Sequence, residues 1–199
     1  MKLTLLAVML LGAAAFAFGE GNNFGIGVDG NIYNNTQSAS SKSDFVSNSI
    51  ELRVFAVIPL SETMEVDPSA SVALYSTKDP SGLVTTAGYA VNQNGAGAGL
   101  GFYAALANAG PFTLMSGLLG EVKYLGIPDN LSGDWTYWNA HLALPLFFKA
   151  DVSPSVSLRV TQTVLDLYGR SRSYANASSG FSALQFNQFG PSVGCVYKF

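Results

Sequence analysis

The last eleven residues, 189–199, read Phe-Gly-Pro-Ser-Val-Gly-Cys-Val-Tyr-Lys-Phe. Side chains of an extended strand point alternately to its two faces. One face of this segment would be apolar and would end on an aromatic ring: Phe189, Val193, Cys195, Tyr197 and Phe199. The other face would be mostly small or polar: Gln188, Gly190, Ser192, Gly194 and Lys198. The alternation therefore predicts a β-strand with one apolar and one polar face.

The same two-residue period recurs along the chain. Eight extended segments follow it: 23–33, 47–60, 64–77, 95–107, 111–124, 135–148, 155–168 and 181–199. Charged residues make up 12% of the chain, against about a quarter in soluble domains. Strands that turn one face to lipid and one to a lumen are typical of membrane barrels. We therefore predict an all-β fold, an eight-stranded antiparallel up-and-down transmembrane β-barrel, with a bulge after Gln162 where the pattern blurs.

Short and long connections alternate between these segments. Three are short turns, at 61–63, 108–110 and 149–154. Four are long and polar: 34–44, 78–94, 126–134 and 169–180. Outer-membrane barrels combine short periplasmic turns with long extracellular loops, so we expect both termini on the periplasmic side.

The first residues have the features of a secretory signal peptide. Lys2 supplies a positive charge, residues 3–18 carry none, and small residues before Gly19 fit a cleavage site. The alternative is a membrane-anchor helix, but the apolar stretch is shorter than the roughly 18–20 residues that a span needs. We expect residues 1–19 to be a cleaved signal peptide and residues 20–199 to form the barrel domain. The single cysteine, Cys195, argues against a disulfide framework.

These features resemble the small eight-stranded outer-membrane barrels of the OmpA-transmembrane, OmpX and OmpW type. The resemblance rests on the signal peptide, the eight alternating segments, the loop asymmetry and the terminal Tyr197-Lys198-Phe199. It implies a Gram-negative-type envelope, contact with outer-membrane lipid and exposure at the cell surface. It also implies a protein partner, the barrel-assembly machinery, which would recognise the last strand through Val193, Cys195, Tyr197 and Phe199.

Charged side chains fall on the inner faces of the predicted strands. They form a candidate lumen charge network: Asp29, Glu51, Arg53, Glu65, Asp67, Glu121, His141 and Arg159. We expect Asp29 and Arg53 at similar levels on adjacent strands, with His141 and Arg159 near that level. An unpaired buried charge is strongly destabilising, and an eight-stranded barrel is only wide enough for side chains to fill it. The network therefore predicts a largely plugged lumen.

Glycines and aromatic residues also have distinct places in this scheme. Four glycines share one inner face: Gly95, Gly97, Gly99 and Gly101. They leave room for a passage or, as we favour, for a large neighbour such as Tyr75, Tyr103 or Phe55. Aromatic residues near strand ends predict interfacial girdles, with these members: Tyr124, Trp135, Trp138, Phe147 and Phe148. The alternative is a soluble barrel with these aromatics in its core, whose outer face would be richer in Lys and Glu.

Three function classes follow from this scheme. The first is a structural or surface-interaction barrel, in which the long loops would bind a surface ligand. The second is a narrow porin-like channel for small molecules, including hydrophobic ones, because four apolar side chains face inward: Phe55, Val57, Met115 and Leu119. The third and least favoured is a lipid-modifying enzyme that uses His141.

The sequence offers little for catalysis, metals or nucleic acid. The chain has one His and one Cys, without the spacing of a metal site or of the common hydrolase motifs. Its net charge of −3 provides no basic face for nucleic acid. We therefore predict a protein that is not an enzyme, with no catalytic residues, no cofactor, no metal and no nucleic-acid partner.

Overall fold

The structure, a computed structural model, describes residues 24–39, 43–78, 90–127, 135–174, 177–186 and 191–199. These residues form nine β-strands: β1 (Gly25–Ala39), β2 (Ser43–Pro59), β3 (Met64–Lys78), β4 (Ala90–Ala109), β5 (Phe112–Ile127), β6 (Trp135–Ser153), β7 (Val156–Tyr174), β8 (Ala177–Phe186) and β9 (Ser192–Lys198). No helix within these ranges is long and apolar enough to cross a membrane. The predicted signal peptide, residues 1–19, lies outside the described residues.

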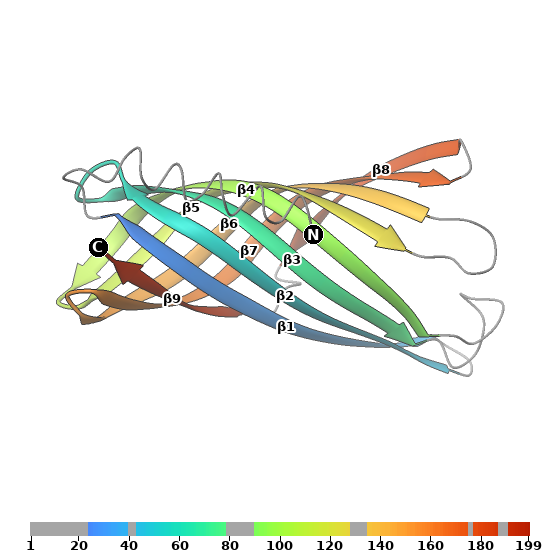
Figure 1. Ribbon diagram of the computed structural model, residues 1–199, viewed down its shortest axis with the longest axis horizontal. Helices are drawn as coiled ribbons and strands as arrows, with labels where there is room; N and C mark the ends of the chain where they lie inside the picture. Colours follow the sequence, from blue (N-terminus) through green and yellow to red (C-terminus); the bar gives the residue numbers. More distant parts are fainter. Residues whose placement is uncertain (1–23, 40–42, 79–89, 128–134, 175–176, 187–190) are drawn as a thin grey trace.

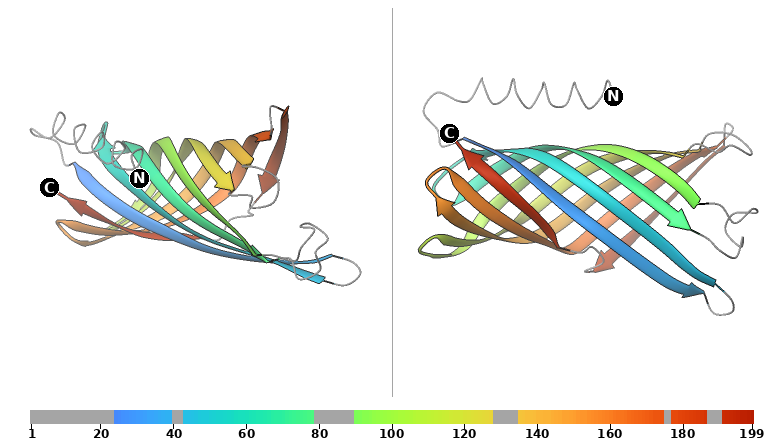
Figure 2. Two further views of the ribbon diagram at one scale, coloured as in Figure 1. Left: turned by 45° about the vertical axis from the view of Figure 1, so that its right-hand side comes forward. Right: turned by 60° about the horizontal axis from the view of Figure 1, so that its bottom comes forward.

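Consecutive strands from β1 to β7 are antiparallel hydrogen-bonded neighbours. The sheet closes because β9 pairs with both β1 and β7 (Figure 1). β9 pairs with Val156–Thr161 of β7, and β8 pairs with Leu165–Tyr174 of the same strand. The two short strands therefore occupy one strand position, and the predicted eight-stranded antiparallel barrel is confirmed. Figure 2 shows the tilt of the strands around its wall.

The predicted bulge lies in β7. The register between β6 and β7 pairs Leu144 with Leu165 and Pro145 with Thr163, so that it skips Val164. One extra residue in a strand reverses the alternation beyond it. Asp166 therefore points into the lumen and is buried. The predicted alternation assigns no face to the residues after Gln162.

Several strands run further than the sequence predicts. β1 and β2 take up all the described residues of the predicted loop 34–44, namely 34–39 and 43–44. β7 and β8 take up most of 169–180 in the same way, and β6 takes up most of the predicted turn 149–154. Hairpin partners extend because ladder hydrogen bonds join backbone groups, whatever the side chains. The turn between β4 and β5 is tight, with Gly110 at a φ of 62° that favours glycine.

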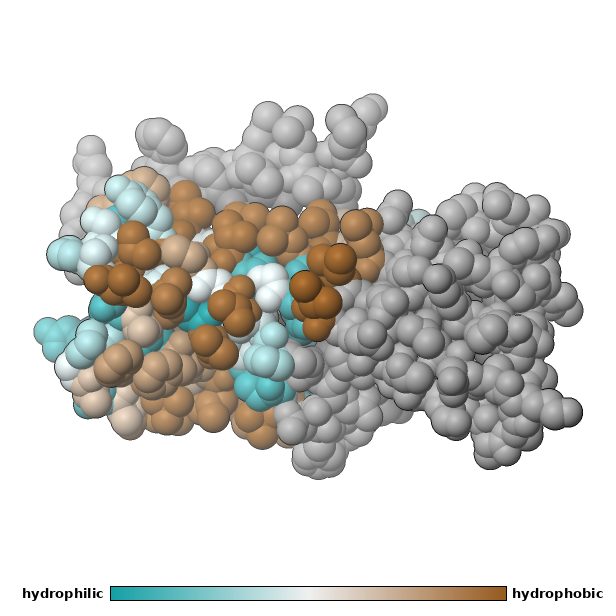
Figure 3. Space-filling model, turned by 90° about the horizontal axis from the view of Figure 1, so that it is seen from below, coloured by the Kyte–Doolittle hydropathy of each residue, from teal (hydrophilic) through white to brown (hydrophobic). Residues whose placement is uncertain are grey.

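The outer face of the barrel is apolar and the inner face is polar. Figure 3 shows apolar side chains over much of the described surface on one side of the barrel. Exposed apolar residues come from all around the wall: Ile26, Leu52, Val72, Leu100, Leu118, Val122, Leu142, Leu158 and Val193. Two small apolar clusters lie inside, Phe55 with Val57 and Val196, and Tyr103 with Met115 and Phe147. The lumen is therefore filled by a mixture of rings and charged groups.

Candidate functional site

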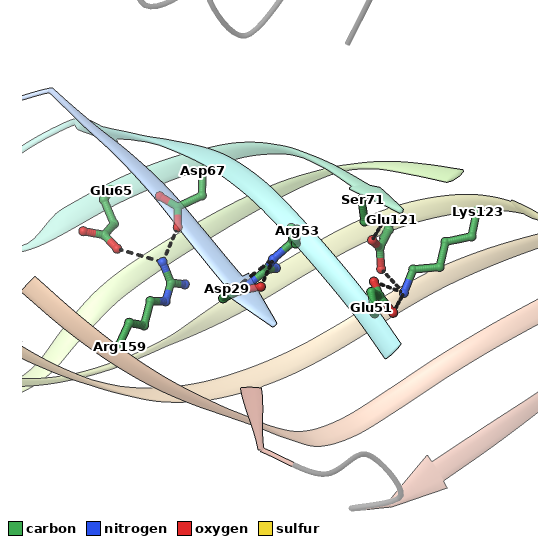
Figure 4. A network of polar contacts seen from close by, with 9 residues as sticks. All are labelled: Asp29, Glu51, Arg53, Glu65, Asp67, Ser71, Glu121, Lys123 and Arg159. Atoms are coloured by element: carbon green, nitrogen blue, oxygen red, sulfur yellow. Dashed lines mark hydrogen bonds and ion pairs between the residues drawn. The ribbon is translucent and has the colours of Figure 1, made fainter. Parts of the chain in front are cut away.

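Arg159 of β7 crosses the lumen. Its side chain is 1% exposed. Nη1 donates a hydrogen bond to Asp67 Oδ2 at 2.6 Å and lies 3.8 Å from Glu65 Oε1. Both carboxylates belong to β3, four strand positions away from β7 around an eight-stranded barrel. The contact therefore joins opposite walls, as the left part of Figure 4 shows.

Three aromatic rings surround the Arg159 guanidinium. Its Cζ lies 3.5 Å from the ring centroid of Phe147 and 5.0 Å from the centroids of Phe55 and Tyr103. A guanidinium within about 6 Å of a ring face is attracted by the ring quadrupole. Arg159 Nε and Nη2 have no hydrogen-bond partner among the described residues, so the rings compensate part of their desolvation. We call Arg159, Asp67 and these three rings the Arg159 plug.

Two glycines make room for the plug. A Cβ added to Gly27 would overlap the Phe55 ring, and one added to Gly101 would overlap the Tyr103 ring. The glycine row thus accommodates a large side chain at Gly101, as favoured from the sequence. Serine side chains lie against the next two positions of the row, Gly97 and Gly99. The side chain of Tyr75 lies outside the described residues.

Arg159 with Asp67 and Glu65 forms the first group of charges in the lumen, and the pair Arg53 and Asp29 forms the second. The two residues are direct cross-strand partners on β2 and β1. Arg53 Nε lies 3.1 Å from Asp29 Oδ1 and 3.2 Å from Oδ2, and Nη2 also donates to Oδ2. A fork of this kind fixes both side chains. Their expected position at similar levels is what the register shows.

The third group joins β2, β3 and β5. Lys123 Nζ lies 2.7 Å from Glu51 Oε1 and 3.0 Å from Glu121 Oε2. Ser71 Oγ donates to Glu121 Oε1 at 3.2 Å. Figure 4 shows the three groups in succession along the lumen.

His141 makes a separate contact with the residue that the bulge turns inward. Its Nδ1 lies 2.9 Å from Asp166 Oδ2, and its ring stacks on Tyr168 with centroids 5.8 Å apart. The register places His141 opposite Tyr168, and Arg159 opposite Lys149. The expectation that His141 and Arg159 lie near one level was therefore wrong. β6 continues to Ser153, through most of the predicted turn, and this shifts the register between β6 and β7 from the one predicted.

The turn end of the lumen contains two more ion pairs. Lys149 Nζ lies 3.2 Å from Glu65 Oε2, and Lys198 Nζ lies 2.7 Å from Asp151 Oδ1. Ser157 Oγ also donates to Asp151 Oδ1. Sequence reasoning missed Lys149 because it placed this residue in a turn, and only the length of the hairpin could have revealed it.

A cavity of about 100 Å³ lies beside these charges. Its lining includes the Arg53–Asp29 pair, the charged residues of the third group, the His141–Asp166 pair and Thr161. It lies on the loop side of Phe55, because Arg53 is two residues further than Phe55 from the turn between β2 and β3. The Arg159 plug is therefore next to this cavity, toward the turn end.

The aromatic residues of the predicted girdle separate into two sets. Tyr124 and Trp138 contact each other with centroids 5.1 Å apart, and Phe148 stacks on Phe112 on the exposed face. Phe147, in contrast, is 1% exposed and belongs to the Arg159 plug. Its place in the girdle was wrong, because neighbouring residues of a strand point to opposite faces. The side chain of Trp135 lies outside the described residues.

The four residues of the predicted assembly signal lie on the exposed face of β9 and at the residue that follows it. Val193, Cys195, Tyr197 and Phe199 are exposed, and the ring of Phe199 contacts those of Tyr197 and Phe24. Within the described ranges, no group of three or more His, Cys, Asp or Glu residues could hold a metal ion.

Comparison with known proteins rests on structure. No protein-family model matches the sequence, and no curated protein matches it. The barrel is similar to the crystal structure of Neisserial surface protein A, with a TM-score of 0.51, 15% identity, and coverage of 88% of this chain and 97% of that chain. It is also similar to a major outer membrane protein from Thermus thermophilus, with a TM-score of 0.50, 15% identity, and coverage of 90% of this chain and 100% of that chain. The chain therefore has the fold of small outer-membrane β-barrels.

Proposed function

We propose that the protein is an integral outer-membrane β-barrel with a plugged lumen, and that it serves a structural or surface-interaction role. The apolar outer face supports the membrane part of this proposal. A closed barrel satisfies its backbone groups internally, which lipid requires, and exposed aliphatic side chains are stable there. Export through the signal peptide predicted at residues 1–19 belongs to the same proposal. Co-fractionation of the protein with outer membranes would test it.

The observation that carries the plugged lumen is the Arg159 contact between opposite walls. A buried guanidinium that is paired and enclosed by rings is held firmly, because separating it would leave charges uncompensated in a low dielectric. The Arg53–Asp29 and Lys123 groups then add two further obstacles along the same axis. An ion that crosses the lumen would have to break several of these contacts.

Planar-bilayer conductance of the refolded barrel, residues 20–199, tests this proposal. We expect no discrete conductance steps from the wild type and stable steps from the Arg53→Ala/Arg159→Ala double variant. Lys198→Ala is the control, because Lys198 pairs with Asp151 at the turn end, away from the plug. Heat-modifiable gel migration would establish that each variant is folded. Near-zero conductance of the folded double variant would contradict the proposal.

A narrow channel is the second candidate, and the cavity on the loop side of the plug favours it. The inward apolar residues argue against a hydrophobic path, because Phe55, Val57 and Met115 are buried in packed clusters. Discrete conductance steps from the wild-type protein would contradict the plugged lumen and would identify the barrel as a channel. Ion selectivity would then be set by the lining charges.

The remaining parts of the proposal concern partners and catalysis. The exposed residues of β9 would be recognised by the barrel-assembly machinery, and the segments at the loop end would contact a surface ligand. We assign no catalytic role to His141, which contacts Asp166 and the ring of Tyr168. A lipid-modifying activity that disappears in His141→Ala would overturn that assignment.

A further inference from the structure

Among the described residues that line it, the cavity on the loop side of the Arg159 plug has more carboxylates than fixed cations. Four carboxylates line it: Asp29, Glu51, Glu121 and Asp166. The fixed cations among the described lining residues are Arg53 and Lys123. Arg53 forms its fork with Asp29, so that this pair is balanced. Lys123 is shared between two carboxylates, Glu51 and Glu121, so that this group keeps one negative charge in excess.

Asp166 is the lining carboxylate that pairs with neither Arg53 nor Lys123. Its side chain is 3% exposed, and its contact with His141 uses only Oδ2. Oδ1 is buried and has no hydrogen-bond partner among the described residues. Thr161 Oγ1, which is on the same strand and also lines the cavity, is likewise buried without a hydrogen-bond partner among the described residues. A buried carboxylate oxygen without a donor is costly, and a donor that enters the cavity would satisfy it.

We propose that this cavity binds a small organic cation with two primary ammonium groups, that is, a short aliphatic diamine. One ammonium group would donate to Asp166, and the other would donate to Glu51 and Glu121 beside Lys123. Glu121 lies on β5 and Asp166 on β7, and only β6 separates these two strands. Two strand spacings place β5 and β7 about 10 Å apart. A four-carbon diamine can approach both carboxylate sites, because the side chains reach inward from these strands.

The structure also shows why an ammonium group fits better than a metal ion. No group of three or more His, Cys, Asp or Glu residues in the described lumen converges on one point as metal ligands do. An ammonium group needs acceptors on only one side of it, and each N–H can reach a different oxygen. The excess charges lie at two places in the cavity, so a chain with a cation at each end matches them better than one compact ion.

Calorimetric titration of the refolded, detergent-solubilised barrel with 1,4-diaminobutane tests this inference. We expect saturable binding at least tenfold tighter than that of butylammonium, which offers one ammonium group. Tetramethylammonium offers charge without a hydrogen-bond donor and should not bind measurably. Magnesium chloride at the same ionic strength measures the effect of a compact divalent ion. Equal affinity for magnesium or for tetramethylammonium would overturn the inference, as would the absence of binding.

Variants locate the site. Asp166→Asn and Glu121→Gln each remove one carboxylate charge with little change in shape, and each should weaken diamine binding at least tenfold. Asp151→Asn is the matched control, because Asp151 is an exposed carboxylate at the turn end, outside the lining. If Asp166→Asn or Glu121→Gln fails to fold, Glu51→Gln tests the same site, because Glu51 also lines the cavity. Unchanged affinity in the folded cavity variants would overturn the inference, whereas the conductance of the wild-type barrel tests the proposed function independently.

Discussion

Removal of the Arg159 side chain should destabilise the barrel and open its lumen. In Arg159→Ala, Asp67 loses the hydrogen bond that Arg159 Nη1 donates at 2.6 Å. Glu65 keeps Lys149 at 3.2 Å, so the loss falls mainly on Asp67, which is only 3% exposed. A broken buried pair that leaves one charge uncompensated costs about 3–5 kcal/mol. We expect the free energy of unfolding to fall by that amount.

Urea unfolding of the barrel in lipid vesicles, followed by gel mobility, measures this loss. Arg159→Ala/Asp67→Asn is the informative double variant, because it removes the uncompensated charge together with its partner. It should recover at least about 1 kcal/mol relative to Arg159→Ala, since a neutral amide is much less costly to bury than a carboxylate. Arg159→Lys keeps the positive charge but loses the planar group that stacks on Phe147, and should lie between wild type and Arg159→Ala. A loss below about 1 kcal/mol in Arg159→Ala, or no recovery in the double variant, would refute the reasoning.

Three further predictions address the two faces of the barrel. Cys195 is free and exposed on the outer face, so a charged maleimide should label it slowly in lipid vesicles and rapidly after unfolding in urea; equal rates would show that this face is in water. Gly101→Ala would push a methyl group into the Tyr103 ring and should lower the free energy of unfolding by about 1–3 kcal/mol, whereas Gly30→Ala meets only a backbone oxygen at 3.6 Å and should cost less than Gly101→Ala. Phe199→Ala should reduce the amount of assembled barrel in outer membranes without changing the stability of the refolded protein by more than about 1 kcal/mol. Unchanged assembly of this variant would contradict the proposal that the assembly machinery recognises the last strand.

The alternation of side chains predicts most of the barrel wall, because a two-residue period is local and is read directly from neighbouring residues. It places Phe55, Arg53 and Glu121 inside, where the structure has them. It fails where one residue changes the phase. Val164 is skipped by the ladder, and no feature of the sequence around it shows whether Asp166 or Leu165 faces inward. The partner of His141 was missed for that reason.

The contacts across the lumen could not be predicted from alternation. Which carboxylate meets Arg159 depends on the stagger of β3 against β7, and stagger accumulates over every hairpin between them. The β6–β7 hairpin shows how sensitive this is, because its extension through the predicted turn 149–154 brings Lys149 opposite Arg159. Lys149 then reaches Glu65, and Arg159 is directed mainly to Asp67.

The arrangement of rings around Arg159 distinguishes a fixed plug from a gate. A gate would need a second position in which the guanidinium is equally well compensated, because a two-state element requires two arrangements of similar free energy. At its present position Arg159 faces three rings from β2, β4 and β6 and a carboxylate from β3. On the loop side, Asp29 is already held by Arg53, Glu51 and Glu121 share Lys123, and Asp166 contacts His141. A move toward them would exchange a single strong hydrogen bond and three ring contacts for partners that are already occupied. We therefore expect the plug to remain closed across the range of membrane voltages, and voltage-dependent opening of the wild type in a planar bilayer would contradict this.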